Sequence, residues 1–235
     1  MKPGKIYLIP TIIADNTQQT VTTRQVLDIL PDIGHFLAED VRTARRYLSS
    51  LNIYNAIEPL QFEVLNKDTS PTEVKKLLAP IHTGFHIGIL SEAGCPGIAD
   101  PGALAVRFAH DNDIQVIPLV GPSSILLALM ASGLNGQCFA FQGYLPVGAE
   151  ASRRIKSFEQ ESGKKSQTQI FIETPYRSNA LFQSLIGSLQ QETLLCVAVD
   201  ITGKSEYIKT HTVRKWKMIK KKLPKAPAVF LFLSV

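Results

Sequence analysis

Residues 91–102 read SEAGCPGIADPG, and this stretch decides how the rest of the chain is interpreted. It holds three glycines and two prolines in twelve positions, between the apolar run 84–90 and a helix-like run at 103–110. In open α/β sheets, ligands bind where loops leave the carboxyl ends of the strands. Gly94 and Gly97 permit backbone paths that a Cβ atom would block. The stretch is therefore either a plain connector or a loop that offers main-chain groups to a ligand.

The loop lacks the glycine patterns that bind phosphate groups. Neither G-x-G-x-x-G nor G-x-x-x-x-G-K-[ST] occurs in it. A dinucleotide or a nucleoside triphosphate is therefore disfavoured as the ligand.

The composition is that of a globular protein with a packed core. Of 235 residues, 45% are hydrophobic and 19% are charged, which argues against a disordered or fibrous chain. The three cysteines, Cys95, Cys138 and Cys196, are widely spaced and have no metal-ligand spacing. We therefore expect no bound metal and no disulfide framework, which fits a reducing cytoplasm.

Two segments bear on membrane targeting. The N-terminus MKPGKIYLIP lacks the long apolar region of a signal peptide. Residues 114–149 carry no charge, but Pro118, Gly121, Pro122 and Gly133 interrupt them. This segment is interpreted as buried core rather than as a transmembrane helix, and no membrane partner is expected.

Strand-like and helix-like runs alternate along the chain, which predicts an α/β fold with a largely parallel sheet in the first half. The expected strands are 5–10, 35–38, 85–90, 115–120, 139–144, 169–173, 194–201 and 228–233. The expected helices are 23–30, 42–51, 72–78, 104–110, 123–132, 151–162 and 177–189. We place a domain boundary at Pro118–Pro122 and predict two α/β domains, residues 1–117 and 121–235.

The net charge of +5 is unevenly distributed. Residues 201–225 carry nine lysines and arginines against Glu206 alone, a local charge of +8 that leaves −3 for the remainder. Such a segment attracts polyanions such as RNA, or it is a solvated helix face. Trp216 is expected in the core rather than stacked on a base, because Val213 and Ile219 lie at near-helical spacing from it.

Four segments in order carry a family resemblance: LSEAGCPGIADPG, VIPLVGPSSILLALMASGL, FAFQGYLP and IFIETPYR. Together they resemble the tetrapyrrole methylase superfamily, the class III S-adenosylmethionine-dependent methyltransferases. The nearest branch contains the bacterial 16S rRNA ribose 2′-O-methyltransferases, without their C-terminal helical extension. The resemblance, from about Lys5 to Phe232, implies two α/β domains with the cofactor cleft between them. It also implies S-adenosylmethionine as the cofactor and a homodimer.

The resemblance also implies which residues bind the cofactor. In the first loop they are Leu90, Glu92, Ala93, Gly94 and Pro96, followed by Ser123, Ser124, Glu173, Thr174 and Ala228. Two alternatives stay open, since Ser123 could serve only as a helix cap and Glu173 only as a surface carboxylate or a partner of Arg177.

A second set of candidates is catalytic. Glu39-Asp40-Val41-Arg42 is similar to the Glu-Asp-Thr-Arg stretch of the family, with Val41 in place of threonine. Carboxylates beside an arginine at a strand end orient a substrate or relay a proton, so Glu39, Asp40 and Arg42 are the candidates. A structural ion pair is the alternative. Asp100 is expected to cap the helix that follows it.

The chain departs from the branch on the substrate side. Its first loop, residues 10–16, contains no glycine, whereas the branch turns there through Pro-x-Gly. Three hypotheses therefore stay open. The chain methylates RNA on a ribose 2′-oxygen; it methylates a tetrapyrrole or another small molecule; or it binds S-adenosylmethionine without catalysis.

Overall fold

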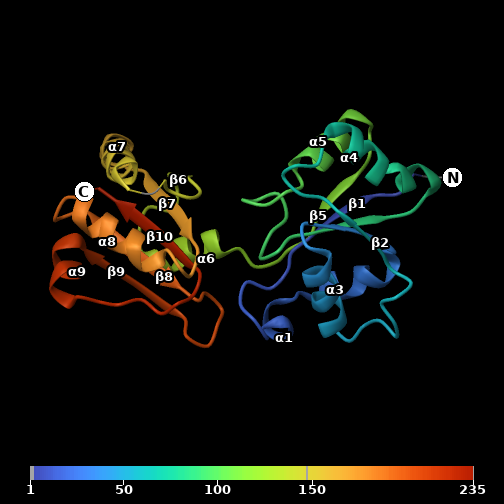
Figure 1. Ribbon diagram of the computed structural model, residues 1–235, viewed down its shortest axis with the longest axis horizontal. Helices are drawn as coiled ribbons and strands as arrows, with labels where there is room; N and C mark the ends of the chain where they lie inside the picture. The colour runs from blue at the N-terminus through green and yellow to red at the C-terminus, as the bar shows by residue number, and fades with distance from the viewer. Residues whose placement is uncertain (1–2, 147, 235) are drawn as a thin grey trace. The chain divides into compact units, whose positions relative to one another are not determined.

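The computed structural model describes residues 3–146 and 148–234 (Figure 1). The chain divides into two compact units, residues 1–123 and 124–235. Each unit contains one five-stranded sheet with helices packed on it. The expected pair of α/β domains is confirmed. No helix of the described residues is long and apolar enough to cross a membrane.

The sheet of the N-terminal unit is parallel throughout, as predicted. Its strands are β1 (Ile6–Ile9), β2 (His35–Ala38), β3 (Gln61–Val64), β4 (Ile87–Leu90) and β5 (Val116–Pro118), in the order β3-β2-β4-β1-β5. Parallel neighbours end at the same edge of a sheet. Because β4 lies between β2 and β1, the loops that follow these three strands emerge side by side.

Both faces of this sheet are buried. The helical segments are α1 (Gln18–Val21), α2 (Arg24–Ile29), η1 (Leu30–Asp32), α3 (Val41–Ser50), α4 (Pro71–Leu77), η2 (Ala79–Thr83) and α5 (Ala103–Asp111). Successive side chains of a strand point to opposite faces. Phe36 accordingly packs in the cluster that includes residues of α2 and α3, and Leu37 in the cluster that includes residues of α4 and α5.

Two helix starts differ in how they are capped. The Thr23 side chain accepts a hydrogen bond from the Val26 N–H and caps α2. Asp100 does not cap α5, so that prediction is wrong. The cap residue is Gly102, at φ +134°, and Asp100 Oδ2 instead accepts a hydrogen bond from the Glu92 N–H at 3.2 Å. The loop folds back on its own start before the helix begins.

The sheet of the C-terminal unit is mixed. Its strands are β6 (Phe139–Phe141), β7 (Thr168–Glu173), β8 (Leu194–Val199), β9 (Tyr207–Thr212) and β10 (Ala228–Leu233), in the order β6-β7-β10-β8-β9. Only β6 and β7 pair in parallel, and the other pairs are antiparallel. Alternation of strands and helices along the sequence does not determine whether neighbouring strands pair in parallel or antiparallel.

The C-terminal unit also buries both faces of its sheet. Its helices are α6 (Ser124–Ser132), α7 (Ala149–Lys165), α8 (Ser178–Ser188) and α9 (Val213–Ile219). Residues of α6 pack on one face, and residues of α7, α8 and α9 on the other. Trp216 of α9 is fully buried, and its Nε1–H donates a hydrogen bond to the Leu195 carbonyl oxygen at 2.8 Å. The expectation that Trp216 belongs to the core is confirmed.

Candidate functional site

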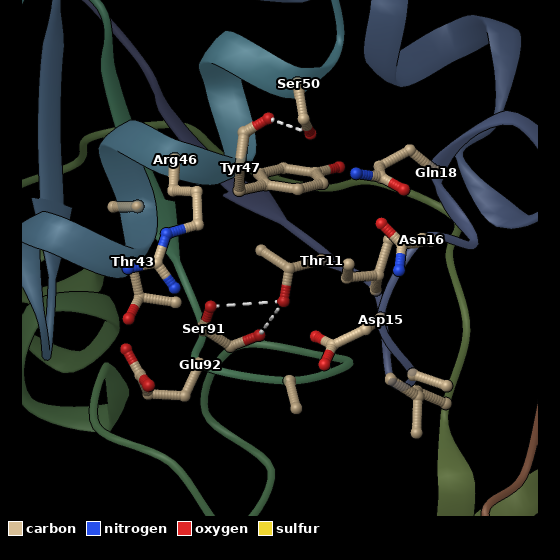
Figure 2. Close-up of a pocket in the computed structure, with 15 residues that line it drawn as sticks. Thr11, Asp15, Asn16, Gln18, Thr43, Arg46, Tyr47, Ser50, Ser91 and Glu92 are labelled. Atoms are coloured by element: carbon tan, nitrogen blue, oxygen red, sulfur yellow. Dashed lines mark hydrogen bonds between the residues drawn. The ribbon is translucent and has the colours of Figure 1, made fainter. Parts of the chain in front are cut away.

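A pocket of about 380 Å³ lies at the carboxyl edge of the N-terminal sheet (Figure 2). Small-molecule sites typically have volumes of about 300–1,000 Å³. The walls come from the loop after β1, from one face of α3 and from the start of the loop after β4. The lining residues are Thr11, Ile12, Ile13, Ala14, Asp15, Asn16, Gln18, Thr43, Ala44, Arg46, Tyr47, Ser50, Ser91, Glu92 and Ala93.

Hydrogen bonds fasten the two loops to each other. The Thr11 hydroxyl donates to the Ser91 carbonyl oxygen at 3.1 Å, and the Thr11 N–H donates to the Gly94 carbonyl oxygen at 2.9 Å. The Ser91 hydroxyl donates to the same Gly94 oxygen at 2.6 Å. Thr11, Ser91 and Gly94 are buried. The pocket wall is therefore built from contacts between loops that lie 80 residues apart in the sequence.

Gly94 is required by its backbone conformation. Its φ is +81°, a region that residues with a Cβ atom rarely adopt. A Cβ at this position would lie 3.2 Å from the Pro122 carbonyl oxygen. The start of the stretch 91–102 is thus a folded part of the pocket wall, in which Ser91, Glu92 and Ala93 line the pocket and Gly94 supports them.

The floor on the α3 side is closed by Tyr47. Its hydroxyl donates a hydrogen bond to the Pro10 carbonyl oxygen at 3.3 Å, and its ring is buried. Burial raises the pKa of Tyr47, so the phenol stays neutral and remains a donor. Arg46, one residue earlier, is exposed and extends its guanidinium beside Thr43 (Figure 2).

The electrostatics of this edge are dominated by carboxylates. Burial is the largest cause that raises the pKa of Glu92, and repulsion from Asp40, Glu39 and Asp100 adds to it. Burial, together with the charge of Glu39, raises the pKa of Asp100 to about 6. Asp40 is the exception, because its hydrogen bond from the Thr43 N–H and the charge of Arg42 lower its pKa. A positively charged ligand at this edge would stabilise the ionised forms of Glu92 and Asp100.

The predicted catalytic residues lie beside the pocket but do not line it. Glu39 follows β2, and Asp40 caps α3 by accepting a hydrogen bond from the Thr43 N–H at 2.8 Å. Arg42 is exposed, and within the described residues no ion pair joins it to either carboxylate. The arginine that lines the pocket is Arg46. The catalytic role of Glu39, Asp40 and Arg42 stays a prediction.

The predicted cofactor residues of the N-terminal unit gather in the loop after β4. Glu92 and Ala93 line the pocket, whereas Leu90, Gly94 and Pro96 are buried behind it. Ser123 directly precedes α6, which begins at Ser124. Within the parts of the chain that the structure describes, no group of three His, Cys, Asp or Glu residues could hold a metal ion.

In the C-terminal unit, Glu173 and Ala228 are cross-strand neighbours at the ends of β7 and β10. Glu173 is buried, and its Oε1 accepts a hydrogen bond from the Thr174 N–H at 2.8 Å. Its Oε2 lies 2.8 Å from Arg177 Nη2, which also donates to the Leu145 carbonyl oxygen at 2.9 Å. The carboxylate is therefore engaged in an ion pair with Arg177, as one of the two alternatives anticipated.

Most of the lining residues were not among the predicted cofactor or catalytic residues, and Thr11, Arg46, Tyr47 and Ser91 are examples. Their only local signal is the spacing on α3, where Thr43, Arg46, Tyr47 and Ser50 fall on one helical face. Thr11 and Ser91 have no signal of this kind, because sheet order alone brings them together.

Comparison with known proteins identifies the family. A ribosomal RNA small subunit methyltransferase I from Synechocystis sp. is 32% identical over 206 residues, which cover 86% of this chain and 69% of that protein. The protein of the same name from Escherichia coli O157:H7 is 31% identical over 209 residues, covering 87% and 68%. The chain belongs to the ribosomal RNA small subunit methyltransferase I family. Its membership makes the chain a methyltransferase, as predicted.

Two solved methyltransferase structures have folds similar to that of this chain. The structure of the methyltransferase CobJ is 13% identical with a TM-score of 0.63, covering 99% of this chain and 100% of that one. Uroporphyrin-III-C-methyltransferase from Thermus thermophilus is 16% identical with a TM-score of 0.56, covering 98% and 94%. Both solved chains share the fold of this chain over nearly its full length. No protein-family model matches the chain.

Proposed function

We propose that this chain transfers the methyl group of S-adenosylmethionine to small-subunit ribosomal RNA, at a ribose 2′-oxygen. The observation that carries the proposal is identity of 30% or more with small-subunit rRNA methyltransferases over at least 86% of the chain. The pocket after β1 and β4 supports it, since ligands of open α/β sheets bind at this edge.

The residues around this pocket fit the cofactor. S-adenosylmethionine supplies an electrophilic methyl carbon on a positively charged sulfonium. The carboxylates of Asp15 and Glu92 lie on either side of the Thr11–Ser91 pair in Figure 2. Burial, and then repulsion from Asp40, Glu39 and Asp100, raises the pKa of Glu92, so a cation bound beside Glu92 would stabilise its ionised form. The apolar side chains of Ile12 and Ile13 add a surface for an uncharged part of the ligand.

The protein's task in this reaction is alignment. Transfer needs the acceptor oxygen in line behind the methyl carbon, and rigid loops hold such a geometry. A ribose hydroxyl is a weak nucleophile until its proton is removed. We assign the proton acceptor to the carboxylate group of Glu39, Asp40 and Glu92. A raised pKa makes Glu92 a stronger base than an ordinary surface carboxylate.

A methylase of a tetrapyrrole or another small molecule is the second candidate. The observation that favours it is the glycine-free loop 10–16, which lines the pocket and departs from the rRNA branch. RNA binding separates the two, because phosphate neutralisation makes affinity fall steeply with salt. The proposed assembly is a homodimer, and the proposed location is the cytoplasm, where thiols stay reduced.

Calorimetric titration with S-adenosylmethionine and S-adenosylhomocysteine tests the proposal first. Saturable binding is expected, followed by transfer of labelled methyl groups to purified small-subunit rRNA. Methyl transfer to a small-molecule extract and not to RNA would support the second candidate. A folded protein that binds neither compound is a non-catalytic relative, and the proposal fails.

A further inference from the structure

The C-terminal unit carries a run of cations from α9 to the loop before β10. Lys217, Lys220, Lys222 and Lys225 are exposed, and Lys221 is partly buried. The nine lysines and arginines of residues 204–225 form one ion pair within the described residues, between Arg214 and Glu192. The remaining positive charges are uncompensated, so this surface attracts a polyanion.

The lysines are held in place by the fold. Trp216 anchors α9 in the core through its hydrogen bond to Leu195. Asn179 of α8 holds the following segment at two points. Its Nδ2 donates to the Leu223 carbonyl oxygen at 3.1 Å, and its Oδ1 accepts from the Leu223 N–H at 2.9 Å. A surface fixed in this way loses little conformational entropy when it binds a ligand.

A hollow of about 300 Å³ lies among these cations. Lys217, Lys220 and Lys221 border it, and the side chains of Phe182 and Trp216 contribute to its lining. Lys220 adopts φ +49°, a conformation that is unfavourable for residues other than glycine and asparagine. Lys221 Nζ lies 4.3 Å from the Tyr207 ring centroid, and the charges of the three lysines that border this hollow suit a phosphate group.

The cation run leads to an exposed aromatic ring. Tyr176 is 80% exposed, and Lys225 Nζ lies 4.2 Å from its ring centroid. Tyr176 follows β7 and Lys225 precedes β10, and these strands meet at the Glu173–Ala228 pair. Unpaired RNA bases stack on aromatic rings of this kind beside a phosphate-binding cation.

We propose that Lys217, Lys220, Lys221, Lys222 and Lys225 bind the phosphates of a single-stranded RNA segment and that Tyr176 stacks on one of its bases. This inference rests on the proposed RNA-directed function and adds the surface on which the RNA lies. The segment runs along α9 and the loop before β10 toward the ends of β7 and β10, where two of the residues implied in cofactor binding are located.

The test uses a triple variant, Lys220→Gly with Lys221→Gln and Lys222→Gln. Glycine at 220 suits the observed φ, so this change removes a charge without straining the backbone. Affinity for fluorescently labelled, purified small-subunit rRNA is measured at several KCl concentrations. We expect at least a tenfold loss, and the slope of log K against log[salt] becomes shallower by about 2, or about 0.7 per lost phosphate contact.

Two further variants complete the design. The matched control is Lys67→Gln with Lys75→Gln and Lys164→Gln, which removes the same charge from exposed positions elsewhere. It should retain most of the affinity. Tyr176→Leu should weaken binding by about tenfold with the salt slope unchanged, because stacking releases no counterions.

The outcomes separate this inference from the proposed function. Equal losses in the triple variant and the control, or no loss in either, overturn the inference. Lysine-dependent binding to anionic phosphatidylglycerol vesicles with RNA binding unchanged overturns it in favour of a membrane surface. S-adenosylhomocysteine is titrated into every variant. A wild-type protein that fails to bind it contradicts the proposed function, whereas intact cofactor binding with lysine-independent RNA binding contradicts this inference alone.

Discussion

Thr11 and Ser91 are joined by a hydrogen bond of 3.1 Å from the Thr11 hydroxyl to the Ser91 carbonyl oxygen. The two residues follow β1 and β4, which are neighbours in the sheet. Each of these loops also contributes to the pocket wall. The shape of the pocket therefore depends on this contact between loops as much as on either loop alone.

Replacement of Thr11 tests that dependence. Thr11→Val keeps the shape of the side chain and removes the buried hydroxyl, so the free energy of unfolding should fall by about 1 kcal/mol. We also expect weaker binding of S-adenosylhomocysteine in calorimetry, because the two loops are no longer fastened. Thr72→Val on exposed α4 is the control and should change neither quantity. Unchanged affinity in Thr11→Val would show that the pocket does not need this contact.

Gly94 and Gly97 provide a matched pair for the loop after β4. Both have positive φ, +81° and +77°, but a Cβ at 94 would meet the Pro122 carbonyl oxygen, whereas a Cβ at 97 meets nothing within 4 Å. Gly97→Ala should cost only backbone strain, about 1 kcal/mol. Gly94→Ala should cost more and weaken S-adenosylhomocysteine binding. Equal effects of the two changes in thermal unfolding and calorimetry would contradict the placement of Gly94 in the wall.

The raised pKa of Glu92 and of Asp100 predicts a pH dependence with a definite sign. These carboxyls bind protons more readily in the folded chain than in the unfolded one, so their contribution to stability is present at low pH and lost as pH rises through their folded-state pKa, which is about 6 for Asp100. The affinity for a cationic ligand should depend on pH in the opposite direction. A sulfonium cation prefers ionised carboxylates, so affinity for S-adenosylmethionine should fall as pH drops below about 6.

The uncharged sulfur of S-adenosylhomocysteine supplies the comparison. Its affinity, measured by calorimetry between pH 5 and pH 8, should change less than that of S-adenosylmethionine. Asp100→Asn should flatten the difference near pH 6, since the titrating group is gone. Parallel pH curves for the two ligands in the wild-type protein would show that the carboxylates do not face the sulfonium.

Substitution of Glu173 distinguishes a structural role of this residue from a role in cofactor binding. Its carboxylate is buried and paired with Arg177, so Glu173→Gln should lower the free energy of unfolding of the C-terminal unit by about 2 kcal/mol. Because the carboxylate is buried and paired with Arg177 within the unit, we expect S-adenosylhomocysteine affinity to change less than twofold. A loss of affinity without a loss of stability would restore the cofactor role implied by the family resemblance.

Strands made of apolar runs were predictable from the sequence, including the edge strands β5 and β6, whereas the polar edge strands β3 and β9 were not. β2 and β10 have the predicted bounds, because buried strands read as short apolar runs. β3 and β9 were missed. Both lie at sheet edges, and residues such as Gln61 and Lys209 are exposed on them. A half-solvated edge strand keeps polar side chains, so its sequence does not differ from that of a loop.

The sequence predicted pocket residues only where they lie within a single recognisable motif. Glu92 and Ala93 belong to the opening stretch and line the pocket. Ser91 belongs to the same stretch, but Thr11 and Tyr47 come from two other segments, and their meeting with it depends on β4 lying between β2 and β1. That order follows from packing of the whole sheet rather than from any local pattern. The role of Asp100 was predicted wrongly for a related reason. The residue spacing of the loop does not reveal that it folds back, so that Asp100 accepts a hydrogen bond from the Glu92 N–H.

The position of β10 has a consequence for how the chain is made. This strand is last in the sequence but pairs with β7 on one side and β8 on the other. Once residues 1–123 have emerged from the ribosome, every strand of the N-terminal sheet is present and the sheet can close. The C-terminal sheet stays split, with two open strand edges, until residues 228–233 emerge. A nascent chain stalled before residue 228 is therefore half folded and prone to aggregate through those edges.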